Sequence, residues 1–185
     1  MALLESECIA LGTEAPQFDL QGTDDMNYSL ADFSDKKGLL IVFMCNHCPY
    51  ARAAWPLLID LFSDFEDDIG FIAINSNDAD AYEEDSFDAM RSEAESMGIP
   101  FPYVWDERQA VAEAYEAQCT PDPYLYKRRN NSFELFYHGR INDSWQDEET
   151  VTEESLRQAM RALLSGGMPP SLQKPSMGCS IKWKE

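Results

Sequence analysis

Residues 39–49, LLIVFMCNHCP, join an unbroken apolar run to two cysteines and a proline. Six apolar residues in succession are typical of a strand that is buried on both faces of a parallel sheet. A proline suits the first turn of a helix, because the N–H that it lacks has no partner there in any case. The stretch therefore predicts a buried strand at residues 39–44, a turn that carries Cys45 and Cys48, and a helix that starts at Pro49.

The chain beyond this stretch alternates between strand and helix patterns. A second apolar run at residues 70–75 and a helical pattern that ends at Gly98 would complete a strand, helix and strand unit with parallel strands. Further along we expect a strand at residues 103–105, a short helix around Val111, paired strands at 124–126 and 133–137, and a last helix with Leu156, Ala159, Met160 and Leu163 on its apolar face.

These elements predict a single α/β domain. Its central mixed sheet should contain three parallel strands and a terminal antiparallel hairpin, with helices on both faces. We place the domain at residues 1–166 and a Pro-rich tail, which either packs on the domain or frays, at residues 167–185. Thr150 and Glu153 have the spacing of a capping box for the last helix, and Pro56 should kink the first one.

The charge of the chain excludes several classes of partner. Its 185 residues include 34 acidic and 14 basic side chains, for a net charge of −20. Such a surface opposes binding to nucleic acids, which draws on clustered Lys and Arg, and to anionic membranes. Acidic residues concentrate at 64–95 and 143–154, which we expect to be solvated surface. With no basic or long apolar segment near Met1, and no apolar run near the ~18 residues of a membrane span, we expect a soluble cytoplasmic protein.

The five cysteines point to redox chemistry. Five cysteines are too few for a disulfide-stapled secreted domain, and an odd number cannot all pair within one chain. A helix N-terminus favours a thiolate, so the Cys45-x-x-Cys48 turn predicts a reactive thiol at Cys45, with Asn46, His47 and Pro49 as residues that tune it. Two intervening residues let the sulfurs form a disulfide. The two sulfurs carry both electrons, so no cofactor is required.

Other roles for these cysteines stay open at this point. A zinc site would need two more ligands, and His138, Cys119 and Cys179 show no second paired spacing, so we predict no metal. The two cysteines of the turn could also be buried structural residues. A second signal comes from Thr120 and Pro121, where an X-Pro bond can be cis.

Four segments together resemble one family. Residues 43–50, 119–122, 139–141 and 178–183 are similar to the peroxiredoxin-like branch of the thioredoxin-fold redoxin family, the relatives of alkyl hydroperoxide reductase and thiol-specific antioxidant. The resemblance covers about the whole chain and implies a thioredoxin-like fold with an N-terminal hairpin at residues 18–30. It also implies the roles of four residues: Cys45 as nucleophile, Cys48 as resolving thiol, and Thr120 with Pro121 as a cis-proline loop that faces the sulfurs and pairs with substrate.

One departure from the family bears on the reaction. Peroxiredoxins of this family carry a P-x-x-x-T-x-x-C loop, and with Cys48 at the final cysteine, the Thr position is Cys45 and the Pro position is Ile41. This favours thiol-disulfide oxidoreduction, with a disulfide substrate and a separate reductant. The alternatives are a thiol peroxidase in which Cys48 is oxidised and Cys45 resolves it, and a non-enzymatic redox-sensing or zinc-binding module. Cys119 and Cys179 are possible auxiliary thiols.

Overall fold

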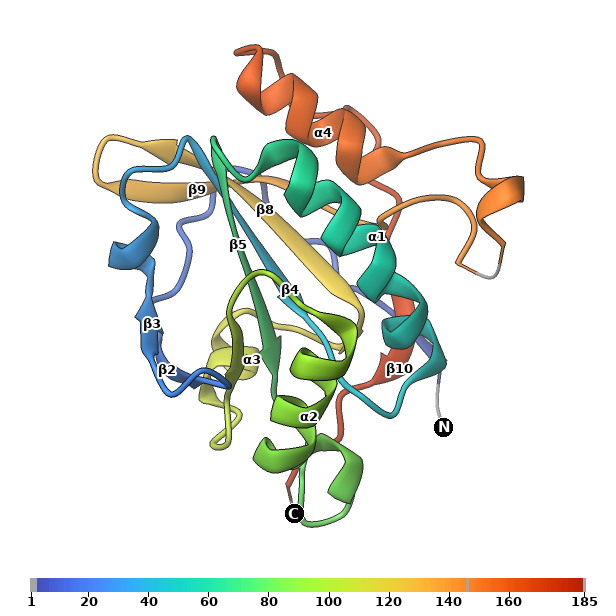
Figure 1. The fold of residues 1–185 in the computed structure, drawn as a ribbon. Helices are drawn as coiled ribbons and strands as arrows, with labels where there is room; N and C mark the ends of the chain where they lie inside the picture. The colour runs from blue at the N-terminus through green and yellow to red at the C-terminus, as the bar shows by residue number, and fades with distance from the viewer. Residues whose placement is uncertain (1–2, 146, 185) are drawn as a thin grey trace.

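The computed structural model describes residues 3–145 and 147–184, which form an α/β fold (Figure 1). The parallel core contains β4 (Gly38–Phe43), α1 (Pro49–Phe65), β5 (Ile69–Asn75), α2 (Phe87–Met97) and β6 (Tyr103–Trp105). Strands β4, β5 and β6 run parallel and neighbour one another in the order β6-β5-β4. The three predicted parallel strands are confirmed.

Antiparallel strands extend this core on both sides to seven strands. They are β2 (Asp19–Gly22), β3 (Asn27–Ser29), β8 (Asp122–Arg129) and β9 (Ser132–His138), and the full order is β3-β2-β6-β5-β4-β8-β9. Both expected hairpins, β2 with β3 and β8 with β9, are therefore present.

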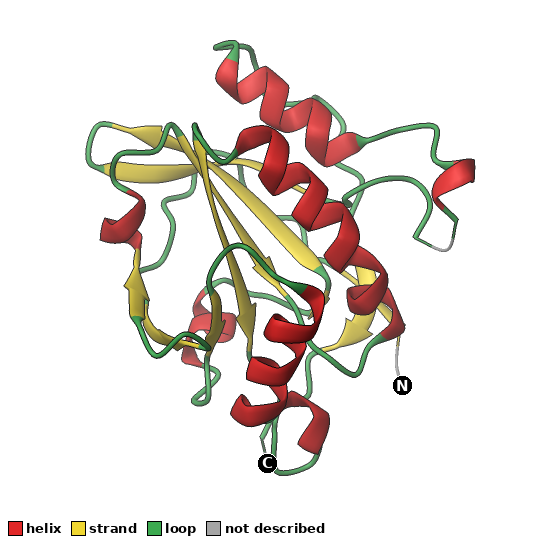
Figure 2. Ribbon diagram, viewed as in Figure 1, coloured by secondary structure: helices red, strands yellow, loops and turns green. Residues whose placement is uncertain are grey.

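Helices cover both faces of the sheet (Figure 2). One face packs on α1, α2 and α4 (Ser155–Leu164), around a core that includes Trp55, Met90 and Met160. The other face packs on α3 (Ala110–Ala114) and the short helix η1 (Leu30–Phe33), around Phe43 and Tyr115. Two further short helices are η2 (Glu83–Asp85) and η3 (Glu148–Thr150). The fold class predicted from the sequence is confirmed.

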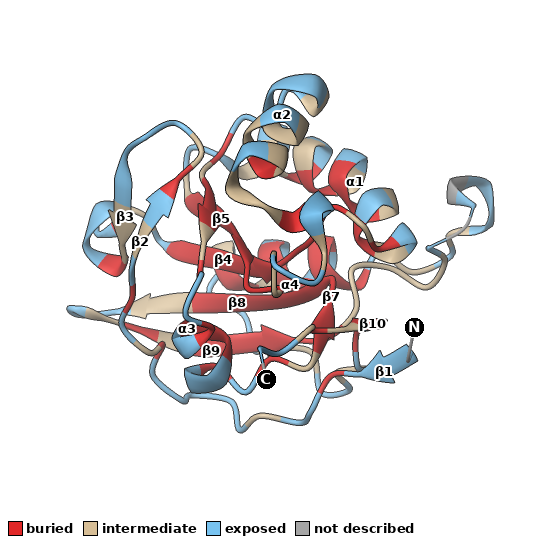
Figure 3. Cartoon of the chain, turned by 90° about the horizontal axis from the view of Figure 1, so that it is seen from below, coloured by how far each residue is buried: buried red, intermediate tan, exposed pale blue. Residues whose placement is uncertain are grey.

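A second sheet, which the sequence did not predict, joins the two ends of the chain. It contains β1 (Leu3–Glu5), β10 (Met177–Ser180) and β7 (Cys119–Thr120), in the order β1-β10-β7 with antiparallel pairing. Figure 3 shows β1 exposed at its outer edge, whereas β7 is buried. The C-terminal tail is thereby held against the loop that contains Pro121.

Local expectations at the helix ends are confirmed in part. Pro49 is the first residue of α1, which continues through Pro56, and Gly98 ends α2 with a φ of 61°. The predicted capping box of α4 is wrong: α4 begins at Ser155, while Thr150 lies in η3 and its hydroxyl donates to Ser144 and Asp147. Asp143 Oδ1 accepts hydrogen bonds from the N–H groups of Thr152 (2.9 Å) and Glu153 (3.0 Å), the groups that a cap at Thr150 would have satisfied. No helix in the described ranges has both the length and the apolar character needed to cross a bilayer.

Candidate active site

The two cysteines of the turn lie at the junction of β4 and α1, as the sequence predicts. Cys48 is the N-cap of α1, and Cys45 follows the end of β4 by two residues. Both side chains are 0% exposed. Of the two cysteines, Cys48 is therefore the one next to the free N–H groups of the first turn of α1.

The loop before β8 faces both sulfurs. The Thr120–Pro121 peptide bond is cis. The Thr120 hydroxyl lies 3.0 Å from the Cys45 sulfur, and the Cys48 sulfur lies 3.4 Å from the Thr120 carbonyl oxygen. Residues 120 and 121 thus form one wall of the dithiol site, which agrees with the placement that the family resemblance implies.

The pKa values of the two thiols move in opposite directions. The pKa of Cys48 falls from 9.0 to about 5, because its sulfur accepts hydrogen bonds from the Cys45 thiol, the Cys179 thiol and the N–H of Ala51 in α1. Burial raises the pKa of Cys45 well above 9.0, and the bond to Cys48 and the charge of Asp85 raise it further. In the contacting pair the lowered pKa falls on Cys48, first through its hydrogen bond from Cys45, whereas the sequence predicts the reactive thiolate at Cys45.

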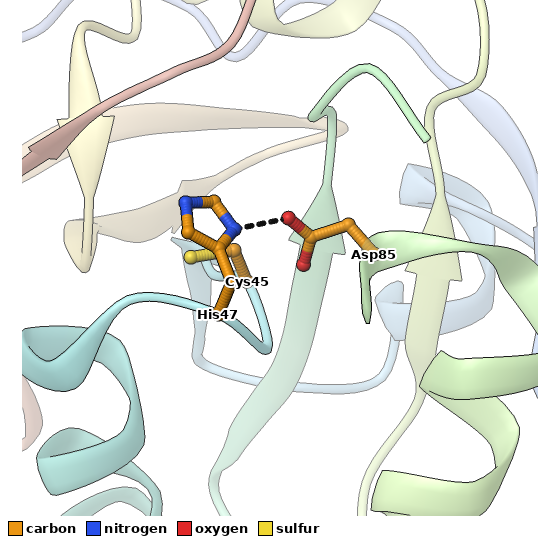
Figure 4. Close-up of side chains that lie close together, drawn as sticks. All are labelled: Cys45, His47 and Asp85. Carbon is orange, nitrogen blue, oxygen red and sulfur yellow. Dashed lines mark hydrogen bonds and ion pairs between the residues drawn. The ribbon is translucent and has the colours of Figure 1, made fainter. Parts of the chain in front are cut away.

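His47 pairs with a carboxylate instead of standing alone beside the thiol. Its Nδ1 contacts the Asp85 carboxylate, and its ring stacks on Tyr82 with centroids 4.9 Å apart. Figure 4 shows the Cys45 sulfur and the Asp85 carboxylate on opposite sides of the ring. The Nε2 atom of His47 is buried without a hydrogen-bond partner. The ring can therefore accept or return a proton at the dithiol, with Asp85 fixing its orientation.

Asp85 is the main site residue that the sequence reasoning missed. It is 0% exposed at the end of η2, and its Oδ1 accepts hydrogen bonds from the N–H of Asn46 (2.7 Å) and the amide of Asn75 (3.1 Å). Asn46 also accepts from the Tyr103 hydroxyl at 2.9 Å. The assignment of the whole 64–95 acidic segment to solvated surface is thus wrong at this residue. An acidic run has no periodicity that singles out the one carboxylate that turns inward.

Within residues 3–145 and 147–184, Cys45, His47 and Asp85 form a group that could hold a metal ion. Each offers one donor atom, and these atoms lie within 4.8 Å of one another. Zinc sites use four ligands, or three and a water, so this set could serve only an open site. His138 is not part of the group, since its Nε2 bonds to Asp122 at 2.9 Å and its ring stacks on Tyr124.

The two auxiliary cysteines occupy different surroundings. Cys179 in β10 is 4% exposed and forms a hydrogen bond with Cys48 through its thiol. Cys119 in β7 is 0% exposed, and its sulfur lies 4.0 Å from the carbonyl of Pro121. Burial raises the pKa of both thiols, that of Cys179 to about 12. Of the two, only Cys179 has a sulfur contact to the Cys45–Cys48 pair.

A groove of about 260 Å³ opens beside Pro121. Its walls come from α1, the 140–145 loop and the tail, and they include Leu57, Pro175 and the paired rings of Tyr50 and Trp145, whose centroids are 3.9 Å apart. The groove, whose lining also includes Arg140, Asp143 and Lys174, reaches Pro121 of the cis-proline loop.

Comparison with known families matches residues 11–136 to the AhpC/TSA family, a span that contains β4, the dithiol turn and the cis-proline loop. The chain belongs to the AhpC/TSA family. The resemblance inferred from the sequence motifs is thereby confirmed.

Curated relatives of this AhpC/TSA chain include two thiol-disulfide oxidoreductases. It is 25% identical over 120 residues to ResA of Bacillus subtilis (strain 168), which covers 64% of this chain and only 63% of that relative. It is 22% identical over 160 residues to ResA of Geobacillus thermodenitrificans (strain NG80-2), covering 86% and 81%.

Two solved structures share the whole fold. One is an uncharacterized conserved protein from Geobacillus kaustophilus, with a TM-score of 0.93, 43% identity, and coverage of 100% of this chain and 97% of that one. The other is a hypothetical protein from Sinorhizobium meliloti 1021, with a TM-score of 0.91, 38% identity, and coverage of 97% and 98%.

Proposed function

We propose that this chain is a thiol-disulfide oxidoreductase that cycles its Cys45–Cys48 pair between dithiol and disulfide. The observation that carries the proposal is the hydrogen bond between the Cys45 and Cys48 sulfurs beside the cis-proline loop, whose Thr120 hydroxyl lies 3.0 Å from the Cys45 sulfur. The distant ResA relatives are named for the same chemistry. In this proposal the protein reduces a disulfide substrate in the cytoplasm, and a separate reductant restores the dithiol.

The opposite pKa directions assign the two sulfurs different steps. The Cys48 thiolate attacks a substrate disulfide, forms a mixed disulfide and releases one substrate thiolate. Cys45 then loses its proton to His47 and attacks the Cys48 sulfur, which releases the second substrate thiol and leaves a Cys45–Cys48 bond. This order reverses the roles that the family resemblance implies.

Single-cysteine variants test both the activity and the order of attack. We expect Cys45→Ser and Cys48→Ser each to lose the reduction of insulin disulfides by dithiothreitol down to the uncatalysed rate. The adduct experiments are made with Cys179 also replaced by serine in both variants, and Cys45→Ser should then accumulate a mixed disulfide with a small aromatic disulfide at Cys48. A stable adduct at Cys45 in Cys48→Ser, with none at Cys48 in Cys45→Ser, would restore the roles implied by the family, and full activity in either variant would refute the exchange mechanism.

A thiol peroxidase is the second candidate, and the lowered pKa of Cys48 favours it, since a peroxide is attacked by a thiolate. Against it, Ile41 lies within β4 and is 0% exposed, so that position contributes nothing to a peroxide-binding loop. Peroxide consumption with a thioredoxin-type reductant separates the two functions: a wild-type rate no higher than that of Cys48→Ser removes the peroxidase.

The candidate of another class, a zinc-binding or sensing module, is tested by metal content. One zinc per chain as purified, together with thiols that do not react with an aromatic disulfide, would replace the exchange mechanism with metal binding at Cys45, His47 and Asp85.

A further inference from the structure

The tail strand β10 lies directly against the residue that contacts both active sulfurs. In the antiparallel pairing of β10 with β7, Cys179 is opposite Thr120. A side chain at Gly178 would place its Cβ 2.0 Å from the Thr120 carbonyl oxygen, so glycine permits this close approach. Strand β10 also contacts α1, whose N-cap is Cys48. Strand β10 pairs with β7 and packs against α1, and these two contacts hold Cys179 beside the dithiol.

Cys48 is the shared neighbour of two other thiols. Its sulfur forms hydrogen bonds with the thiols of Cys45 and Cys179, and the N–H of Cys179 donates to it as well. All three cysteines belong to one buried cluster. A sulfur with a thiol on two sides can form a disulfide with either one, provided that the backbone allows the short movement to bonding distance.

We propose that Cys179 is a third redox-active thiol, which exchanges with Cys45 for a disulfide bond to Cys48. The proposal rests on the Cys45–Cys48 couple proposed above. In the step, the Cys179 sulfur attacks the Cys48 sulfur of the Cys45–Cys48 disulfide, a Cys48–Cys179 bond forms, and the Cys45–Cys48 bond breaks. The thiol proton of Cys179 ends on Cys45, so the step is an isomerisation that consumes no oxidant and no reductant.

The surroundings of Cys45 stabilise the thiol that the step produces. Burial and the charge of Asp85 keep the proton on Cys45 once it is released. The product leaves Cys45 as a thiol and ties the tail covalently to the start of α1, so oxidation of the dithiol fixes strand β10 in place.

The test removes Cys45 and follows the remaining thiols. Cys45→Ser is treated with oxidised glutathione, and its disulfides are mapped by mass spectrometry after the thiols are blocked. We expect glutathione to add to Cys48 and then to be displaced by Cys179, with about one Cys48–Cys179 disulfide per chain and the release of two glutathione thiols. Cys45→Ala is treated in the same way, so that the result does not depend on a serine in a buried position.

Two matched variants serve as controls. Cys45→Ser/Cys179→Ser should stop at the glutathione adduct on Cys48, whereas Cys45→Ser/Cys119→Ser should still form the Cys48–Cys179 bond. A persistent adduct on Cys48 with Cys179 still reduced, in both Cys45→Ser and Cys45→Ala, would overturn the inference.

Failure of this inference is distinguishable from failure of the proposed function. If wild type reduces insulin and forms the Cys45–Cys48 disulfide while no Cys48–Cys179 bond appears in the Cys45 variants, only the third thiol is refuted. If the Cys48–Cys179 bond forms but loss of Cys45 leaves the insulin rate unchanged, the proposed function is refuted instead.

Discussion

Burial and a few close contacts shift the pKa values of the two thiols. The Cys45 thiol donates to the Cys48 sulfur, and Asp85 places a negative charge near Cys45. A net charge of −20 spread over the surface acts weakly on buried thiols, since solvent and salt screen it. One buried carboxylate acts more strongly, because little water lies between it and the sulfur.

A pH titration of the reduced protein should resolve the two thiols. Because the pKa of Cys48 is lowered to about 5, we expect thiolate absorbance near ~240 nm to rise with a midpoint at that pH and to gain no second thiolate from Cys45 below pH 9. The variant Cys8→Ser is the right background, since Cys8 is exposed. The acid transition should vanish in Cys48→Ser; its persistence there, with loss in Cys45→Ser, would assign the thiolate to Cys45.

The lowered pKa of Cys48 also makes the stability of the folded protein depend on pH. A thiol with a lowered pKa in the folded state stabilises that state fully above its unfolded pKa of 9.0, and this contribution is lost as the pH falls toward 5. The free energy of unfolding of the reduced protein, relative to Cys48→Ser, should therefore rise between pH 5 and pH 9. A difference that stays flat over that range would contradict the lowered pKa.

The variant Asp85→Asn tests whether the negative charge of Asp85, and not only its hydrogen bonds, matters at the dithiol. The amide keeps an oxygen for the N–H of Asn46 but removes the charge that raises the pKa of Cys45, so that pKa should fall. His47 loses its anionic partner, and we expect the rate of disulfide exchange to drop about 10²-fold, the usual size of a lost acid or base. A matched exposed variant, Asp80→Asn, should change neither quantity. An unchanged Cys45 pKa in Asp85→Asn would show that the carboxylate acts only as a structural acceptor.

At the scale of secondary structure, prediction from the sequence succeeds where a pattern is long enough to carry a signal. Strand β4 and helix α1 follow from an apolar run and a proline, and α2 ends at Gly98 as expected. Strands β1, β7 and β10 contain two to four residues each, too few for alternation to show. Their pairing is set by contacts between distant segments, which is also why the contact of Cys179 with Cys48 and the inward turn of Asp85 were not predicted.

Gly178→Ala tests the close packing of β10 on the cis-proline loop. The added Cβ would lie 2.0 Å from the Thr120 carbonyl oxygen, a contact with backbone that rotation of a side chain cannot relieve. We expect a loss of about 1–3 kcal/mol in the free energy of unfolding and faster hydrogen exchange in β10. Met177→Ala, at an exposed position of the same strand, should stay within about 0.5 kcal/mol of wild type. Equal stability of the two variants would show that the strand is not held tightly.

At the scale of the whole molecule, the excess of acidic side chains should oppose compaction. Local ion pairs offset only part of it; Arg157, for example, contacts Asp60, Asp64 and Glu154. Each exposed pair contributes roughly 0–1 kcal/mol, and repulsion among the unpaired carboxylates remains.

The melting temperature should therefore rise with ionic strength. Between about 0.05 M and 0.5 M NaCl the Debye length falls severalfold, and screening weakens repulsion among the excess carboxylates more than it weakens the few ion pairs. Calorimetry of the reduced protein measures this directly. A melting temperature that falls with added NaCl would mean that the ion pairs outweigh the net repulsion.

The redox equilibrium of the protein in glutathione buffers tests the Cys45–Cys48 couple most directly. With Cys119 and Cys179 replaced by serine, we expect a single two-electron transition of about 30 mV per tenfold change in the ratio of disulfide to dithiol, at a potential between roughly −270 and −120 mV. The transition should disappear in Cys45→Ser and in Cys48→Ser. A protein that stays fully reduced across the whole range, or a transition that survives the loss of either cysteine, would contradict the proposal that this pair carries the electrons.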